Sequence, residues 1–273
     1  MMETYKPFIL AISLFFVLSA SILAAPGDLK PTFSGDGKLI YRTLTHSGEG
    51  ANAVAIQADG KIVVAESGSS TKGNATEDTH TNYGFLPMGG VTGGAVTAIA
   101  ISGSNVYVGG SFNTAGDISA SYIAKWDGTT WSTLGSGMNG FVTALAVAAN
   151  GDLYAGGNFT TAGGVPANRV ARWDGSTWSP VGSGTNGPVW SLKISGTDLY
   201  AGGEFTTAGG GSASKIARWN GSSWSPLGSG MNDRVMQLRY RGTVISMQGG
   251  GSQRRAVFRR TRSLNGTALD GRH

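Results

Sequence analysis

The sequence predicts an all-β protein made of repeated four-stranded antiparallel units, and three observations support this fold class. The chain repeats itself about every 46 residues, and Tyr107, Tyr154 and Tyr200 mark steps of 47 and 46. Apolar residues alternate within each repeat in short runs, which is typical of half-buried strands rather than of helices. Glycine accounts for 45 of the 273 residues, as tight turns and close sheet packing require. The same steps separate the two tryptophans of each repeat, at Trp126, Trp173 and Trp219 and at Trp131, Trp178 and Trp224.

The repeat over residues 142–187 shows the unit most clearly, with apolar runs at 142–148, 152–159, 169–173 and 178–182. Asn150-Gly151 predicts a tight hairpin between the first two runs, and Asp174-Gly175 predicts a turn between the last two. Residues 163, 164 and 166, two glycines and a proline, are expected to keep the longer middle loop out of regular structure. Four antiparallel strands in about 46 residues make one blade of a β-propeller.

We therefore expect an all-β, β-propeller-like array of about four to five blades, which is incomplete if the last blade does not form. The predicted blades cover 51–94 (degenerate), 95–140, 141–187, 188–232 and 233–273 (degraded or out of frame).

The repeat resembles a kelch repeat in its Gly156-Gly157 doublet, its Arg172-Trp173-Asp174 strand and the following Trp178. The motifs FTTAGG, WDG or WNG, and WSPLGSG are more similar still to the kelch-like repeats of secreted bacterial surface proteins and of fungal cortical-marker propellers. Residues 27–66, with TF at 32–33 and QADGKIVVA at 57–65, resemble the delta-sixty repeat, a bacterial propeller-type family. This second resemblance implies two strands of a first blade at 52–58 and 61–66.

The N-terminus predicts export. Lys6 precedes an apolar run over residues 7–25, which is typical of a secretory signal peptide over 1–25, with an uncleaved anchor as the alternative. We expect a protein that is secreted or held at the cell surface, or alternatively periplasmic, with no membrane span after cleavage. The chain has no cysteine, so no disulfide framework adds to this argument. Residues 26–50 form an N-terminal segment whose run at 38–44 is expected to complete the last blade and close the ring.

The repeat pattern stops after Leu238, and residues 239–273 contain eight arginines and one acid, Asp270. A basic tail is one interpretation. A second follows from codon degeneracy, because codons that begin one nucleotide earlier can spell YAGGGFTTAGGVPANKVAKWNGSGWSP, close to the repeat that begins at Tyr154. We favour a single-base deletion near Leu238, with an intact gene that continues into further blades. The tail contributes +7 to the formal net charge of +5, which leaves −2 elsewhere, so we expect no nucleic-acid partner.

Residues that could carry chemistry are sparse. His46, His80 and His273 share no metal-ligand spacing, and we expect no metal, no cofactor and no catalytic residue. Asp127, Asp174 and Asn220 follow the first tryptophan of each repeat, where turn formation explains them better than calcium binding. The recurrence of the tryptophans favours packing between sheets over stacking on sugars.

Positions that differ between repeats are the better candidates for ligand binding, since packing demands repetition and a ligand does not. Ser111, Asn158 and Glu204 follow the Gly-Gly doublets, while Trp190 and Lys193 depart from the pattern of their strand. A drifting repeat predicts the same variety. We expect a binding or structural scaffold for an unknown protein or glycan at the cell surface, with self-association through an incomplete propeller edge as a further expectation.

Two alternatives stay open at this point. One is a carbohydrate-binding or carbohydrate-active propeller, because propellers host both kinds of function. A clustered pair of carboxyls would favour the enzyme, and Glu204 with Asp198 or Asp233 is the only nearby supply, although nothing in the sequence pairs them. The other is a truncated, frameshifted fragment of a longer repeat protein.

Overall fold

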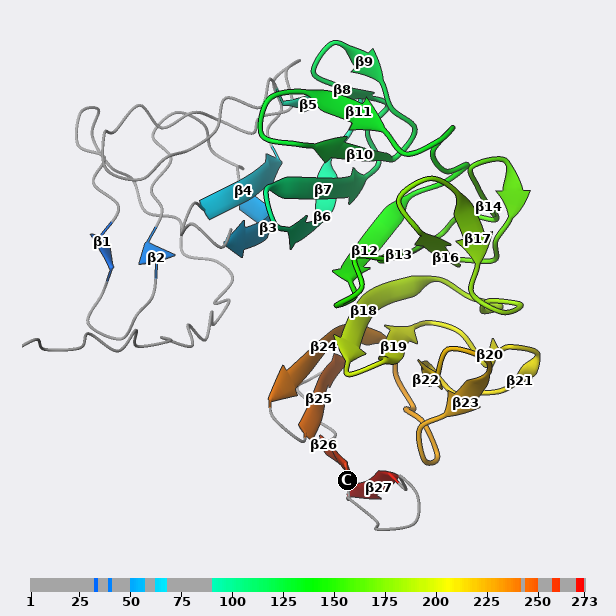
Figure 1. The fold of residues 1–273 in the computed structure, drawn as a ribbon. Coiled ribbons are helices and arrows are strands. Elements are labelled where there is room, and N and C mark those ends of the chain that lie inside the picture. Colours follow the sequence, from blue (N-terminus) through cyan, green and yellow to red (C-terminus); the bar gives the residue numbers. More distant parts are fainter. Residues whose placement is uncertain are drawn as a thin grey trace, which may run out of the picture. The chain divides into compact units, whose positions relative to one another are not determined.

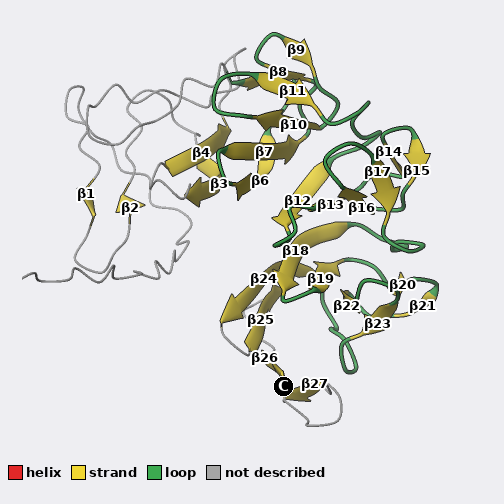
Figure 2. Ribbon diagram, in the orientation of Figure 1, coloured by secondary structure: helices red, strands yellow, loops and turns green. Residues whose placement is uncertain are grey.

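The computed structural model describes the strands at 32–33, 39–40, 50–56 and 62–67, then residues 90–241, 244–249, 257–260 and 269–272. Side chains are described over 90–238. The predicted signal peptide over 1–25 lies outside these ranges. The chain divides into two compact units, Met1–Glu49 and Gly50–His273. Within the described ranges all regular structure is β, as Figure 2 shows, and no helix there is long and apolar enough to cross a membrane.

The second unit contains four sheets of four antiparallel strands each, and consecutive sheets contain consecutive parts of the chain (Figure 1). We number these sheets as blades 1 to 4. Blade 1 is β6 (Val96–Ser102), β7 (Asn105–Gly110), β10 (Ile123–Trp126) and β11 (Trp131–Thr133). Blade 2 is β12 (Val142–Val147), β13 (Leu153–Gly157), β16 (Val170–Trp173) and β17 (Trp178–Pro180). Blade 3 is β18 (Val189–Ser195), β19 (Asp198–Gly203), β22 (Ile216–Trp219) and β23 (Trp224–Pro226). Blade 4 is β24 (Val235–Arg241), β25 (Val244–Gly249), β26 (Val257–Arg260) and β27 (Leu269–Arg272).

Shorter pairings complete the fold. Strands β3 (Gly50–Ile56) and β4 (Ile62–Ser67) pair next to blade 1, where the sequence predicts two strands at 52–58 and 61–66. In the first unit β1 (Thr32–Phe33) pairs with β2 (Leu39–Ile40). The expectation that residues 38–44 complete the last blade concerns the relation between the two units and stays a prediction.

Blade 2 confirms the four predicted strands, with ends that differ by at most two residues. The turn at Asn150-Gly151 is confirmed as well, and Gly151 has φ 92°. The expectation of an irregular middle loop is wrong, because Thr161–Ala162 (β14) pairs with Val165–Pro166 (β15). Gly163 and Gly164, with φ of 58° and 84°, supply the two positive φ angles that a two-residue hairpin turn needs. The same hairpin recurs as β8 (Thr114–Ala115) with β9 (Ile118–Ser119) and as β20 (Thr207–Ala208) with β21 (Gly211–Ser212), and β5 (Val91–Thr92) joins β8.

The hydrophobic core lies between blades. Each first strand packs against the first strand of the next blade, so that β6, β12, β18 and β24 follow one another. One cluster joins Tyr107 and Ile123 of blade 1 to Val142 and Leu153 of blade 2, and all four are buried. A single blade therefore cannot bury its own apolar face, which is the usual reason that repeat units occur in arrays.

The Gly-Gly doublets allow this packing. A Cβ atom at Gly156 would lie 2.8 Å from Val189 Cγ1 of the next blade, and one at Gly157 would clash with Phe141 O of its own blade. The first glycine thus permits contact between blades and the second permits contact within a blade. The same pair of contacts recurs at Gly109-Gly110 and at Gly202-Gly203.

The tryptophans also join the blades, which confirms the packing interpretation. The indole of Trp178 is buried and donates its Nε1–H to Leu134 O of blade 1 at 2.8 Å. Trp224 donates in the same way to Val181 O at 2.8 Å. Within blade 2 the rings of Trp173 and Trp178 lie with centroids 5.4 Å apart.

The two ends of the blades differ in construction. At the end that we call the loop end, each first strand begins, each second strand finishes and the β8–β9, β14–β15 and β20–β21 hairpins stand between second and third strands. At the opposite, hairpin end, short turns join the first strand to the second and the third strand to the fourth.

Candidate functional site

The positions that vary between repeats gather at the loop end. Asn158 and Glu204 donate their backbone N–H groups to the residue that precedes the first strand, to Phe141 O and Pro188 O, each at 2.9 Å. Ser111 makes the same bond to Ala95 O at 2.9 Å. The backbone at this end is therefore fixed in the same way in three blades, while the side chains that it presents differ.

An aromatic pair, the exposed Phe141 and the half-buried Tyr122, lies at the loop end between blades 1 and 2. Phe141 is 53% exposed, which is unusual for a phenylalanine beside a packed core. Its ring meets the edge of Tyr122, with centroids 5.8 Å apart and an angle of 63° between the planes. Blade 3 has Pro188 in place of Phe141, so the repeat does not require this pair for packing.

Three bulky residues at the loop end have a backbone conformation that ordinarily favours glycine. Tyr122, Arg169 and Lys215 precede the third strands of blades 1, 2 and 3, with φ of 66°, 66° and 65°. Each is held at both ends, since its N–H donates to the preceding loop and its carbonyl accepts from the Gly-Gly doublet, at 2.8 to 3.1 Å. A left-handed conformation costs about 1 to 2 kcal/mol for a residue with a side chain. Because the same conformation and the same two hydrogen bonds recur in three blades, the repeat itself requires this backbone, and only the side chains that leave it differ.

The first strands add a second variable row. Each begins with a β-bulge, whose extra residue is Thr97, Thr143, Trp190 or Met236 in successive blades. The hydroxyls of Thr97 and Thr143 donate to Val142 O and Val189 O of the next first strand, at 2.6 and 2.5 Å. Trp190 cannot make this bond, and its indole N–H has no acceptor within the described residues. Met236 is 43% exposed. The bulge row thus changes from small hydroxyls to large apolar groups along the chain.

The predicted candidates divide accordingly. Four of the five, Ser111, Asn158, Glu204 and Trp190, lie at the loop end, although the Ser111 hydroxyl accepts from Ala95 N–H at 2.9 Å and is used within its own blade. Asn158 and Glu204 are exposed. Lys193 lies apart from them in β18, where it stands opposite Tyr200 of β19 and nearer to the hairpin end.

Sequence reasoning missed Phe141, Tyr122, Arg169, Lys215 and Met236. The signal that could have found them was the one applied to the Gly-Gly doublets, namely a comparison of equivalent positions across repeats. The strained backbone of three of these residues could not be read from the sequence.

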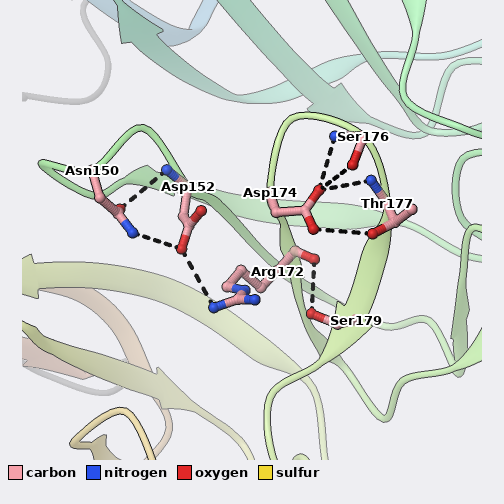
Figure 3. A network of polar contacts seen from close by, with 7 residues as sticks. All are labelled: Asn150, Asp152, Arg172, Asp174, Ser176, Thr177 and Ser179. Carbon is pink, nitrogen blue, oxygen red and sulfur yellow. Dashed lines mark hydrogen bonds and ion pairs between the residues drawn. The ribbon is translucent and has the colours of Figure 1, made fainter.

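The hairpin end carries a different kind of polar network, drawn for blade 2 in Figure 3. Asp174 accepts the backbone N–H groups of Ser176 and Thr177 at 2.9 and 2.8 Å, and also their two hydroxyls. The hydrogen bonds from the backbone of Thr177 and Ser176 hold the pKa of the Asp174 carboxyl well below its usual range. Asp127 and Asn220 accept equivalent bonds in blades 1 and 3. The turn-forming interpretation is therefore confirmed.

Next to this turn, Arg172 lies 3.5 Å from Asp152, which also accepts a hydrogen bond from the Asn150 side chain at 2.9 Å. Ser179 Oγ donates to Arg172 O at 3.4 Å across the neighbouring strand. All these partners are within one blade, so the network serves the blade's own stability.

The carboxyls of Glu204 and Asp198, which the sequence does not pair, stand apart at the two ends of β19. Asp198 is buried at the start of β19 and forms an ion pair with Arg218 at 2.9 Å. Glu204 follows the other end of the same strand, about 20 Å away at the rise of an extended strand. Two carboxyls of a glycosidase stand less than about 10 Å apart. Asp233 accepts the backbone N–H of Arg234 at 2.7 Å. Over the described residues no group of three or more His, Cys, Asp or Glu side chains could hold a metal ion.

Comparisons with known proteins agree with this architecture. The family profile described as the Rax2 C-terminal beta propeller domain matches residues 75–248. No curated protein matches the chain.

Several solved structures are similar to the chain at low sequence identity. A chain of the mitotic checkpoint complex is 15% identical with a TM-score of 0.53, over 86% of this chain and 68% of that one. YCF48 bound to D1 peptide is 18% identical with a TM-score of 0.47, over 82% and 68%. The computationally designed Ika4 protein is 18% identical with a TM-score of 0.46, over 66% and 99%. At these identities a likeness shows the fold alone. The predicted propeller is confirmed, while the finer kelch and delta-sixty assignments stay predictions.

Proposed function

The chain belongs to the family of Rax2 C-terminal β-propeller domains, and on this premise we propose that its loop end is a binding surface for a protein partner. The blades act as the rigid scaffold that holds this surface. The observation that carries the proposal is the division between the two ends. At the hairpin end the turn between the third and fourth strands repeats in three blades, with Asp127, Asp174 or Asn220 accepting the same bonds. At the loop end the positions after the Gly-Gly doublets and before the third strands present different side chains on the same backbone hydrogen bonds.

The composition of the loop end favours a protein over a glycan. Phe141, Tyr122, Trp190, Met236 and Arg169 are of the residue types that are enriched at protein interfaces. Aromatic and arginine side chains also supply most of the binding energy in such interfaces. The second tryptophans of the repeat do not offer a platform for sugars, since Trp178 and Trp224 bond to the preceding blade through their indole N–H groups.

Trp190 would contribute through its half-buried ring rather than through its indole N–H. The indole nitrogen is out of contact with solvent and without an acceptor in the described chain, so a partner at the surface cannot reach it. A protein segment with an apolar side chain against Phe141 or Met236 would cover the apolar surface that these two residues expose.

A library of random linear peptides, displayed on phage and selected on the purified full-length chain, tests the proposal. Selected peptides are titrated by calorimetry against the wild type, Phe141→Ser and Trp190→Thr. Loss of a central contact costs about 2 kcal/mol or more, so we expect each change to weaken binding about thirtyfold. Position 190 of blade 3 is equivalent to position 143 of blade 2, where a threonine stands. We therefore expect Trp190→Thr to fold normally.

Thr197→Ala is the matched control, because Thr197 is exposed in the turn between β18 and β19 at the hairpin end. This variant should bind as the wild type does. Peptides that respond to Thr197→Ala and ignore Phe141→Ser would refute the loop end as the binding surface. A library that yields no binder would refute the choice of a protein segment as ligand.

We propose further that the protein acts outside the cytoplasm, at the cell surface or in the medium. The support is the charged and apolar pattern of residues 1–25. Expression in the native host followed by N-terminal sequencing should give a mature chain that begins near residue 26. A cytoplasmic product that still begins at Met1 would contradict this location.

A further inference from the structure

Neighbouring blades are joined at the loop end by an asparagine clasp. The side chain of Asn139 reaches blade 2, where its Oδ1 accepts the backbone N–H groups of Thr160 and Thr161 at 2.8 and 2.9 Å. Its Nδ2 donates to Thr160 Oγ1 at 2.8 Å. Asn186 makes the same three bonds to Thr206 and Thr207 of blade 3, again at 2.8 to 2.9 Å.

A second clasp joins the same blades through tryptophan. The residue that accepts the indole N–H, Leu134 or Val181, precedes a glycine that packs on the next blade's tryptophans. A Cβ at Gly182 would lie 2.9 Å from Trp219 Cζ3 and 3.2 Å from Trp224 Cδ1. Each interface therefore requires two threonines and two tryptophans from the following blade.

Blade 3 presents the same clasp to whatever follows it. Leu227, Gly228 and Asn232 stand 46 residues after Val181, Gly182 and Asn186. Asn232 is exposed, and its side chain makes no hydrogen bond with any part of the chain that the structure describes. The two first-strand residues that the next blade must also supply are in place, since Val235 and Leu238 are buried against Tyr200 and Ile216.

The sequence after Leu238 lacks the threonines and tryptophans that the clasp requires. At 46 and 47 positions after Thr206 and Thr207 stand Ser252, Gln253 and Arg254. At the same offset from Trp224 stand Asp270 and Gly271. No tryptophan occurs after Trp224 in the sequence, so the second clasp cannot form.

We infer that the clasp on blade 3 is built for the blade that residues 239–273 encode one nucleotide out of frame. In that frame each codon takes the last base of one residue's codon and the first two bases of the next. The threonines of FTT are then encoded across codons 252/253 and 253/254, and the tryptophan of WSP is encoded across codons 270/271. These are the positions that the Asn232 and Leu227 clasps require. The contacts of blades 1 to 3 show which residues the clasp needs, and the degeneracy of the code permits those residues at these positions. The inference does not rest on the loop end being a binding surface.

The nucleotide sequence gives the sharpest test. The two tryptophan codons of the shifted frame need AAT at Asn265 and GAT at Asp270, and the phenylalanine codon needs GGT at Gly251. We expect T as the third base of all three codons. A C at codon 265 or 270 would turn the required tryptophan into arginine and would overturn the inference.

A protein experiment tests the clasp itself. The full gene is expressed as it stands and with one base inserted at codon 239, each with and without Asn232→Ala. In the restored chain we expect Asn232→Ala to lower the melting temperature by about as much as the matched control Asn186→Ala does. In the unrestored chain Asn186→Ala should lower it and Asn232→Ala should leave it unchanged.

Other outcomes contradict the inference. An Asn232→Ala change that is silent in both chains, or equally harmful in both, would show that no shifted-frame blade engages the clasp. An unrestored chain that sediments as a dimer, and as a monomer after Asn232→Ala, would show that a second copy occupies it instead.

Discussion

Replacing Gly156 by alanine tests the packing account most severely, because one methyl group is placed at the interface of two blades. The new Cβ would lie 2.8 Å from Val189 Cγ1 and 3.1 Å from Leu192 Cγ. Carbon atoms in contact normally stand about 3.5 to 4.0 Å apart, so the neighbours must move by roughly 0.5 to 1 Å. Both are buried in the cluster that joins blades 2 and 3, which leaves them little room to move.

Overpacking of this kind costs about 1 to 3 kcal/mol. For a domain of this size each kcal/mol lowers the melting temperature by about 2 to 4 °C, so we expect Gly156→Ala to melt about 2 to 12 °C below the wild type. Denaturant titration followed by tryptophan fluorescence gives the free energy of unfolding, and calorimetry gives the melting temperature.

Gly211→Ala is the control. Gly211 has no positive φ, and the nearest heavy atom to its added Cβ is Ala208 O at 3.7 Å. The change should be neutral or should stabilise by about 0.5 kcal/mol, because alanine restricts the unfolded chain. In a double-mutant cycle, Val189→Ala should cost less in the Gly156→Ala background than alone, since it removes the clashing methyl. The reasoning fails if Gly156→Ala is as stable as Gly211→Ala, or if the two changes at 156 and 189 are additive.

Two further predictions concern the tryptophan bond and the hairpin turns. Trp178→Phe keeps an aromatic ring but loses the hydrogen bond to Leu134 O. Denaturant titration should show a free energy of unfolding lower by about 1 kcal/mol. Trp173→Phe, which breaks no such bond, is the control, and an equal loss from it would argue against the role of the bond. The pKa of Asp174 is held below its ordinary 3.8 by its turn, so the stability that this carboxylate adds is present above about pH 4 and lost as the pH falls below it. Asp174→Asn, which copies Asn220 of blade 3, should remove that part of the pH dependence in thermal melts between pH 2 and 6, and an unchanged pH profile would show that the turn does not depend on ionisation.

The strands and short turns could be predicted because they depend on local patterns. Alternating apolar residues placed four strands in each blade, and Asn150-Gly151 and Asp174-Gly175 marked their turns. The β14–β15 hairpin was missed because two adjacent glycines signal irregular backbone as readily as a positive-φ turn. Their φ angles of 58° and 84° decide between the two.

The candidate site was predicted in part for a similar reason. Variation beside the Gly-Gly doublets led to Asn158 and Glu204, which lie at the loop end. The sequence does not pair Asp198 with Glu204, and the structure keeps them apart, because residues six apart along an extended strand stand at its opposite ends. The partner of Asp198 is Arg218, twenty residues away on the neighbouring strand, and no local pattern indicates that distance.

Hydrogen–deuterium exchange of the full chain, with and without a selected peptide, tests the central claim most directly. If the loop end binds the partner, the peptide will slow exchange in residues 158–169 and 204–215, and will leave the turns at 148–152 and 174–177 as they were. Protection confined to those two turns, with the loop end unchanged, would contradict the account.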